Sequence, residues 1–221
     1  METKSTRDVI LDVAERQFAE RGFRGVSVRE IAAEVGLKNQ ASLYHYFRNK
    51  RALYEAVLAR GVSTLVELVA SGAPTEERTQ DHRAVVEATI DRVVDYLVLH
   101  PHLPRLIQRA GMDDVQAFRG TLVRLLRPLF QQGIGVLAVA GAPWRREELP
   151  HLAAGIYHLI FGYFANSPLL SVVTESNWLD AASLARQRRF LKAAVSELLG
   201  FRRSGEVRLL GTVASGQTAV K

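Results

Sequence analysis

The sequence predicts an all-α protein in which a short helix-turn-helix unit precedes a longer helical domain. Apolar residues recur at spacings of three and four along most of the chain, and alternation with a period of two is rare. Glycines and prolines divide these stretches into about nine helices. Hydrophobic residues make up 48% of the 221 residues, so the chain can form a substantial core.

The first two expected helices end at glycines. The first covers about residues 5–21 and stops before Gly22, while the second begins at Ser27 and stops before Gly36. Ser27 and Glu30 fit an S-x-x-E capping box, in which each side chain accepts a hydrogen bond from the other residue's backbone N–H. The apolar stripe of the second helix comprises Val28, Ile31, Ala32 and Val35.

The next two expected helices differ in length. The third is short and covers about residues 39–46. The fourth follows an N-cap at Asn49 and continues to about Ala70, where Ser71–Pro74 break the helical pattern. Nothing interrupts the fourth helix near Gly61, where we place the boundary between the two units.

Five further helices are expected in the remainder of the chain. They cover about residues 77–100, 101–110, 113 or 114 to 132, 145–165 and 179–199. Pro128 is expected to kink the third of them. The glycine-rich apolar stretch Gly133–Pro143 fits either a frayed helix end or a buried loop, and both remain open.

These elements divide the chain into three parts. Residues 5–61 form the N-terminal unit, with the helix-turn-helix at about 27–47, and residues 62–200 form a helical domain. Residues 201–221 have weak periodicity and many small side chains, and we expect a flexible tail.

Composition excludes several classes of protein. The chain has no cysteine, which excludes disulfides, thiolate metal sites and cysteine nucleophiles. The N-terminus does not resemble a signal peptide, and the longest apolar candidate, Gly155–Leu170, is shorter than the stretch of about 18 residues that a membrane span needs. We therefore expect a soluble cytoplasmic protein with no membrane partner, no metal and no cofactor.

The basic residues are unevenly distributed. The net charge of +6 permits binding to nucleic acid, and the stretch from Lys38 to Arg51 holds four cations and no acid. A second cluster comprises Arg186, Arg188, Arg189 and Lys192. This second cluster fits either another contact surface or a solvated helix face.

Two short helices joined at Val35-Gly36-Leu37 match a helix-turn-helix. Gly36 tolerates the left-handed backbone that the turn needs. Such a motif places the helix after the turn in the major groove of DNA. Polar side chains of that helix suit base edges and phosphates, namely Lys38, Asn39, Gln40, Ser42, Tyr44 and His45.

The segments SVREIAAEVGL (27–37) and SLYHYFRNKRALYEAVL (42–58) resemble the DNA-binding domain of the tetracycline-repressor (TetR) family. The pattern F-x-x-R-G-F at residues 18–23 fits as well, and the resemblance covers about residues 6–60. It implies that Lys38, Asn39, Gln40 and Ser42 lie at the major groove. It also implies that Ser27, Tyr44, Tyr46 and Lys50 contact the DNA backbone or a thymine methyl. The full set of expected DNA contacts is Ser27, Arg29, Lys38, Asn39, Gln40, Ser42, Tyr44, His45, Tyr46 and Lys50.

Two departures from the family pattern concern the reading helix. The step from Gly36 to Phe47 is eleven residues, one more than is usual in the family, so the base-contacting register can shift by one position. Tyr46 stands immediately before the phenylalanine, where the family often has histidine.

A helix-turn-helix of this size makes few base contacts, and a dimer doubles them by reading a palindrome with two helices about 34 Å apart. The resemblance implies a homodimer whose last two long helices form a four-helix bundle. The expected interface residues are Leu152, Ile156, Leu159, Tyr163, Leu184, Phe190, Val195 and Leu198.

Polar residues scattered among aromatic ones between Tyr96 and Trp178 indicate a ligand pocket, for which a hydrophobic or aromatic effector is expected. Its candidate residues are Tyr96, Arg105, Gln108, Met112, Phe118, Trp144, His158, Phe161, Phe164 and Trp178.

The sequence therefore predicts a ligand-responsive DNA-binding regulator, a repressor released from a palindromic operator when the effector moves the fourth helix. An architectural DNA-binding protein or an activator without ligand release is the alternative. An enzyme is disfavoured because the chain holds no glycine-rich phosphate loop, nucleophile elbow or paired carboxylate-histidine spacing.

Overall fold

The computed structural model describes residues 4–72, 81–113, 115–140 and 143–201, and within these ranges the helices are joined by loops and turns and there is no β-strand. This confirms the predicted all-α class. The helices are α1 (Thr6–Arg21), α2 (Val28–Val35), α3 (Gln40–Tyr44), α4 (Lys50–Ala70), α5 (His82–Leu99), α6 (Leu103–Met112), α7 (Val115–Val139), α8 (Leu149–Thr174) and α9 (Ala181–Leu198).

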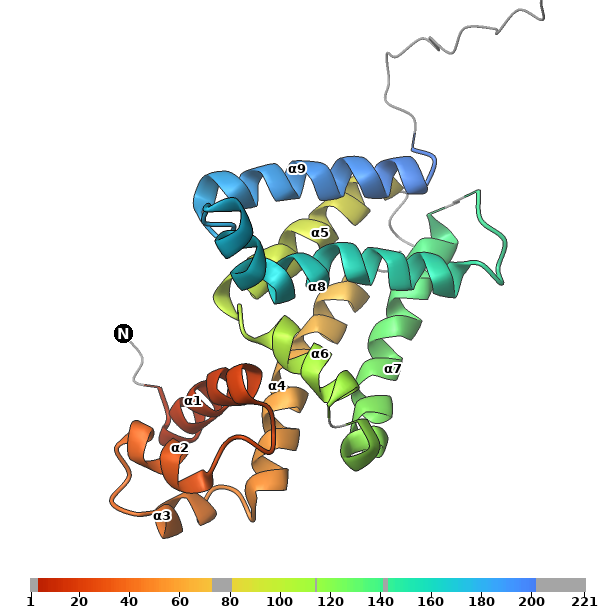
Figure 1. Ribbon diagram of the computed structural model, residues 1–221. Helices are drawn as coiled ribbons and strands as arrows, with labels where there is room; N and C mark the ends of the chain where they lie inside the picture. The colour runs from red at the N-terminus through yellow and green to blue at the C-terminus, as the bar shows by residue number, and fades with distance from the viewer. Residues whose placement is uncertain (1–3, 73–80, 114, 141–142, 202–221) are drawn as a thin grey trace, which may run out of the picture.

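Helices α1 to α3 gather at one end of the molecule, and α4 leads from them into the other helices (Figure 1). Helix α7 packs along α4, α6 packs on α1, and α8 lies against α6 and α7. The three-helix end is therefore held to the remainder through α4, α6 and α7, while α8 and α9 lie on the far side (Figure 1).

Helix α7 is longer than predicted because the stretch after Gly133 is helical. It passes through Pro128 and ends at Val139, so the expected end near residue 132 is wrong and neither a frayed end nor a loop occupies 133–139. Leu137 is buried and Val136 packs against the core. Their burial offsets the roughly 1 kcal/mol by which each glycine weakens a helix interior.

Helix α8 begins at Leu149, not Arg145, and it ends at Thr174, nine residues beyond the predicted end at 165. A start at Leu149 places Pro150 in the first turn, where its missing N–H and fixed φ are tolerated. Further along, Pro168 cannot donate to the carbonyl of Phe164. The hydroxyl of Ser167 donates to that oxygen at 2.9 Å, which allows the helix to continue.

Helices α7 and α8 are each long and apolar enough to cross a membrane, by length and composition alone. The sequence-based statement that no segment approaches such a length is therefore wrong. Buried residues make up 22% of the apolar window in α7 and 28% in α8. Core helices of soluble proteins pass the same test, so the finding is weak evidence for a membrane span.

Two predicted boundaries fall outside the described residues. The expected start of the fifth helix at residue 77 is one of them, and α5 is described from His82 onward. The predicted tail, apart from Phe201, is the other.

Candidate DNA-binding surface and effector cavity

The start of α2 is fixed by the predicted capping box. The backbone N–H of Glu30 donates to the Ser27 hydroxyl at 3.2 Å, and the backbone N–H of Ser27 donates to the Glu30 carboxylate at 2.7 Å. Hydrogen bonds from Ser27 and from Arg21 lower the pKa of Glu30 to about 2. The Ser27 hydroxyl is therefore engaged inside the protein, as a cap should be.

The turn between α2 and α3 depends on Gly36, whose φ of 78° and ψ of 23° are left-handed. The N–H of Leu37 donates to the carbonyl of Ala32 at 2.9 Å, which closes the turn in a Schellman-type arrangement. A residue with a Cβ is strained in this conformation, so Gly36 directs the chain from α2 into α3.

The short helix α3 begins at Gln40, because Asn39 is its N-cap. The Asn39 side-chain oxygen accepts from the Ser42 backbone N–H at 2.9 Å and from the Ser42 hydroxyl at 3.2 Å. Gln40 donates from its amide to the Tyr44 hydroxyl at 2.9 Å. The predicted base-reading side chains of Asn39 and Ser42 are thus partly committed to holding α3, and the pair on the outer face is Gln40 and Tyr44.

The remaining side chains of this segment divide cleanly into inside and outside. Leu43 and Phe47 are buried, while Tyr44 is 44% exposed and Tyr46 is 42% exposed. A tyrosine hydroxyl can donate a hydrogen bond to a phosphate, so exposed tyrosines on a surface that also carries cations suit contact with a nucleic-acid backbone. The other predicted contacts that are exposed are Arg29, Lys38, Asn39, Gln40 and His45, and Ser42 is half-buried.

Lys50 opens α4 behind an Asn49 N-cap, whose side-chain oxygen accepts from the Ala52 N–H at 2.8 Å. The Lys50 ammonium lies 4.5 Å from the centre of the Phe23 ring. Lys50 is thus held at the edge of the three-helix unit. Arg7, which the sequence did not single out, lies 5.2 Å over the Phe47 ring. Its signal in the sequence is only a basic side chain in the first turn of the first helix.

Polar bonds hold α2 to α1. Arg16 pairs with Glu34, to which Gln17 donates at 2.6 Å, and Arg21 pairs with Glu30 at 2.7 Å. These bonds lie on the outside of the apolar core that the first helices share. They fix the helix before the turn, and thereby the orientation of α3.

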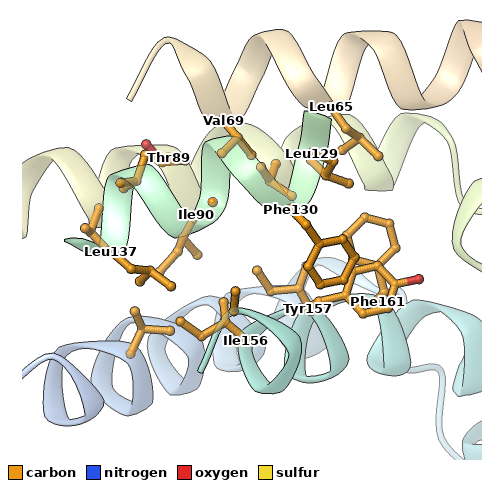
Figure 2. A pocket seen from close by; sticks show the side chains of 17 residues that line it. Leu65, Val69, Thr89, Ile90, Leu129, Phe130, Leu137, Ile156, Tyr157 and Phe161 are labelled. Atoms are coloured by element: carbon orange, nitrogen blue, oxygen red, sulfur yellow. The ribbon is translucent and has the colours of Figure 1, made fainter. Parts of the chain in front are cut away.

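A largely apolar cavity of about 130 Å³ lies between α4, α5, α7, α8 and α9. Its walls include Leu65 and Val69 of α4 and Leu137 of α7 (Figure 2). Three aromatic rings, from Phe130, Tyr157 and Phe161, gather at one end of it (Figure 2). The ring centroids of Tyr157 and Phe161 are 4.4 Å apart and stacked. Burial raises the pKa of Tyr157 to about 12, so its hydroxyl stays neutral.

The predicted pocket residues are distributed over four places. Phe161 lines the apolar cavity, and Arg105, Gln108 and Met112 line a second pocket between α6 and α8. Phe118 is buried against Tyr54, and Tyr96 donates to the carbonyl of Gly61 at 3.3 Å. The other four lie on α8 or near its ends. The indole N–H of Trp144 donates to the Leu198 carbonyl, and that of Trp178 donates to the Thr174 hydroxyl. On α8 itself, Phe164 packs on Tyr163 and His158 packs on Tyr157.

The predicted interface residues fall into three groups. Leu152, Tyr163 and Val195 are buried within the single chain, and Ile156 and Val195 line the apolar cavity. Leu159, Leu184 and Leu198 are partly buried, and Phe190 is exposed. Other exposed apolar side chains that the sequence did not single out are Leu169, Val172 and Val173, at the end of α8.

Comparison with known proteins gives a consistent picture. Residues 10–57 match the family described as "Bacterial regulatory proteins, tetR family". Over 179 residues, covering 76% of this chain and 82% of the relative, the chain is 33% identical to the probable HTH-type transcriptional regulator YttP of Bacillus subtilis. Over 110 residues it is 32% identical to the HTH-type transcriptional repressor SCO4008 of Streptomyces coelicolor, and it spans about half of that protein, 52%.

A solved structure shows the same fold at low identity. The fatty acid degradation regulator FadR from Bacillus halodurans superposes with a TM-score of 0.65 at 15% identity, covering 88% of this chain and 98% of that one. The likeness in fold therefore extends well beyond residues 10–57, the N-terminal segment that matches the family.

Proposed function

Because the chain belongs to the TetR family of bacterial regulatory proteins, we propose that it is a cytoplasmic homodimeric repressor that a small apolar effector releases from a palindromic operator. The family and the relatives are DNA-binding transcriptional regulators, not enzymes, and the chain is such a regulator.

One observation carries the DNA-binding part of the proposal. Gly36 and the Asn39 cap present α3 with Leu43 turned into the core and Tyr44 exposed. Side chains that can pair with bases stand beside cations that can pair with phosphates. Gln40 has the amide that suits adenine, and Lys38 supplies a nearby positive charge.

The cavity supports the effector part of the proposal. Its walls are almost wholly apolar, and its hydroxyl-bearing residues are Thr89 and Tyr157. The Thr89 hydroxyl donates to the carbonyl of Val85 at 2.8 Å and accepts from the Arg92 guanidinium at 2.9 Å, which leaves it little capacity for a ligand. A molecule that enters this space is therefore uncharged and mainly hydrocarbon or aromatic, since a charge would lose its hydration without a partner.

The dimer part rests on the end of α8. Val172 is 78% exposed and Val173 is 70% exposed, and Phe190 of α9 is 52% exposed. Exposed apolar side chains on the two helices that lie farthest from α3 provide a surface that a second subunit can cover. The two reading helices of such a dimer would remain free for one DNA duplex.

Selection of bound duplexes from a random pool tests the proposal. We expect a palindromic consensus, and affinity that falls steeply with salt because phosphates are contacted. Gln40→Ala should then weaken binding to the selected duplex by about 1–3 kcal/mol per lost base pairing. Gln131→Ala, on the exposed surface of α7, is the matched control and should bind as the parent does.

Two results would refute the proposal. A pool that yields no consensus at low salt removes the DNA-reading role of α3. The second result is that Gln40→Ala and Tyr44→Ala both bind the consensus duplex as tightly as the parent does. In that case the protein binds DNA, but through another part of its surface.

A further inference from the structure

Helix α6 has two distinct faces. Leu103, Leu106 and Ile107 are buried in the core. The opposite face carries Arg105, Gln108, Arg109 and Met112, spaced as neighbours on one side of a helix. This face lines a pocket of about 340 Å³ whose other wall is the second half of α8.

The pocket between α6 and α8 shares no lining residue with the apolar cavity, and its chemistry is different. Among the described residues, two arginines and one acid line it, and the carboxylate of that acid, Asp113, lies 3.6 Å from the guanidinium of Arg109. Arg105 forms no hydrogen bond or ion pair with the residues that the structure describes. The pocket therefore holds an excess of positive charge, next to the amide of Gln108.

The pocket also has an apolar side. Met112 of α6 and Leu169 of α8 line the pocket and are strongly exposed to solvent, and Pro168 stands beside Leu169. An occupant would cover these side chains, whose exposure costs free energy in roughly direct proportion to their apolar area. The combination of a planar cation, an amide donor and apolar side chains fits a small molecule with an anionic head and a short hydrocarbon body.

We propose that the α6–α8 pocket is a binding site for a small organic carboxylate, separate from the apolar effector cavity. The carboxylate accepts hydrogen bonds from the Arg105 guanidinium, whose two-pronged geometry matches it, and from the Gln108 amide. The hydrocarbon part lies between Met112 and Leu169.

The position of Arg109 links this site to the three-helix unit. Its guanidinium lies where a side chain at Gly22 would be, 2.9 Å from the ideal Cβ position, and Gly22 ends α1. A carboxylate beside Arg105 competes with Asp113 for Arg109 and so acts on the contact between α6 and α1. The effect on DNA affinity rests on the proposed function, whereas binding of the carboxylate does not.

Calorimetric titration of the full chain with hexanoate, in the absence of DNA, tests the site. Hexanamide, which is neutral and similar in shape, is the matched ligand. We expect hexanoate to bind at least about tenfold more tightly than hexanamide, because hydrogen bonds to a charged head are the stronger ones. Arg105→Gln should weaken hexanoate by at least about tenfold and leave hexanamide unchanged.

Two further variants keep the test decisive. Gln108→Glu, at an exposed position, places a carboxylate three residues from Arg105 and should abolish hexanoate binding without disturbing the core. Arg124→Gln, on the exposed surface of α7, removes the same charge elsewhere and should have no effect.

Several outcomes overturn the proposal. They are an absence of hexanoate binding to the parent chain, equal affinity for hexanoate and hexanamide, and hexanoate binding that survives both Arg105→Gln and Gln108→Glu. Hexanoate binding that leaves operator affinity unchanged would contradict only the link through Arg109. A failure to find any operator would contradict the proposed function and leave the calorimetric result standing.

Discussion

Phe118, near the start of α7, connects α7 to the three-helix unit. Further along, the same helix lines the apolar cavity. The side chain of Phe118 is 1% exposed. The centre of its ring lies 4.6 Å from that of Tyr54 and 4.9 Å from that of Phe23. The Arg51 guanidinium lies 4.9 Å over the same ring and donates to the carbonyl of Ala117 at 2.7 Å. Replacing Phe118 by leucine keeps most of the apolar volume and removes these ring interactions.

The size of the effect follows from the ring interactions that leucine cannot make. Two aromatic pairs contribute about 0.5–1.5 kcal/mol each beyond their buried area. The cation over the ring contributes about 0.5–1 kcal/mol at a partly exposed site. Phe118→Leu should therefore lower the free energy of unfolding by about 1.5–4 kcal/mol. Phe130→Leu, on the same helix, removes one ring pair with a centroid distance of 5.7 Å and should cost about 0.5–1.5 kcal/mol.

Urea denaturation followed by far-ultraviolet circular dichroism measures both variants against the parent. The slope should stay constant, so that a shift in midpoint reports a change in stability. The two leucine variants share the same chemical change, and only their neighbours differ. If Phe118→Leu costs no more than Phe130→Leu, the rings around Phe118 do not hold α7 to α4 and the reasoning fails.

Three other predictions concern the turn, the cap and the dimer. Gly36→Ala should cost about 1–2 kcal/mol in the same denaturation assay because its φ of 78° is left-handed, while Gly135→Ala, in open space on α7, should be neutral or stabilising. The pKa of Glu30 is lowered from 4.5 to about 2, so the stability that its carboxylate contributes is present above pH 4.5 and is lost as the pH falls toward 2. The difference in urea midpoint between the parent and Glu30→Gln should therefore shrink over that range. A difference that stays constant would contradict the capping role. Val172→Asp should dissociate the dimer in sedimentation velocity while Val98→Asp on α5 should not, and a parent chain that sediments as a monomer would remove the proposed interface.

The three-helix unit could be predicted from the sequence because its signals are local. The capping box at Ser27, the left-handed turn at Gly36 and the N-cap at Asn49 each involve residues within a few positions of one another. Such hydrogen bonds form in the same way whatever the remainder of the chain does. The start of α3 is also set locally, since Asn39 caps the helix and Gln40 is its first residue.

The long helices are harder to predict because distant contacts decide where they end. The glycines after Pro128 disfavour helix, yet Leu137 and its neighbours are buried and the helix continues. In α8 the defect at Pro168 is repaired by the Ser167 hydroxyl, a bond that the spacing alone does not reveal. Local helix propensities underestimate the length of such helices, because burial against other helices outweighs the cost of glycine or proline within them.

The cavity could not be located from the sequence because it lies where five helices meet. The aromatic residues that the sequence singles out are of the right type, but type does not fix which face of a helix points inward. Phe161 faces the cavity, whereas Trp144 and Trp178 hydrogen-bond near the ends of α8 and α9. The residues that line the cavity are mostly plain aliphatic side chains such as Leu65 and Val69, which carry no signal for a ligand.

The arrangement of α7 gives a physical route from the cavity to the DNA-binding surface. Leu129 and Leu137 form part of the cavity wall, and Phe118 of the same helix is wedged against Tyr54. Arg51, in the first turn of α4, donates to the carbonyl of Ala117 in α7. A ligand that favours one placement of α7 over another would therefore also favour one placement of the first turn of α4. Only residues 45–49 separate α3 from α4, so in the proposed complex a small displacement of α4 changes where α3 meets the DNA groove. In the proposed mechanism the coupling between effector and DNA would be of the usual size for allosteric proteins, about 1–3 kcal/mol.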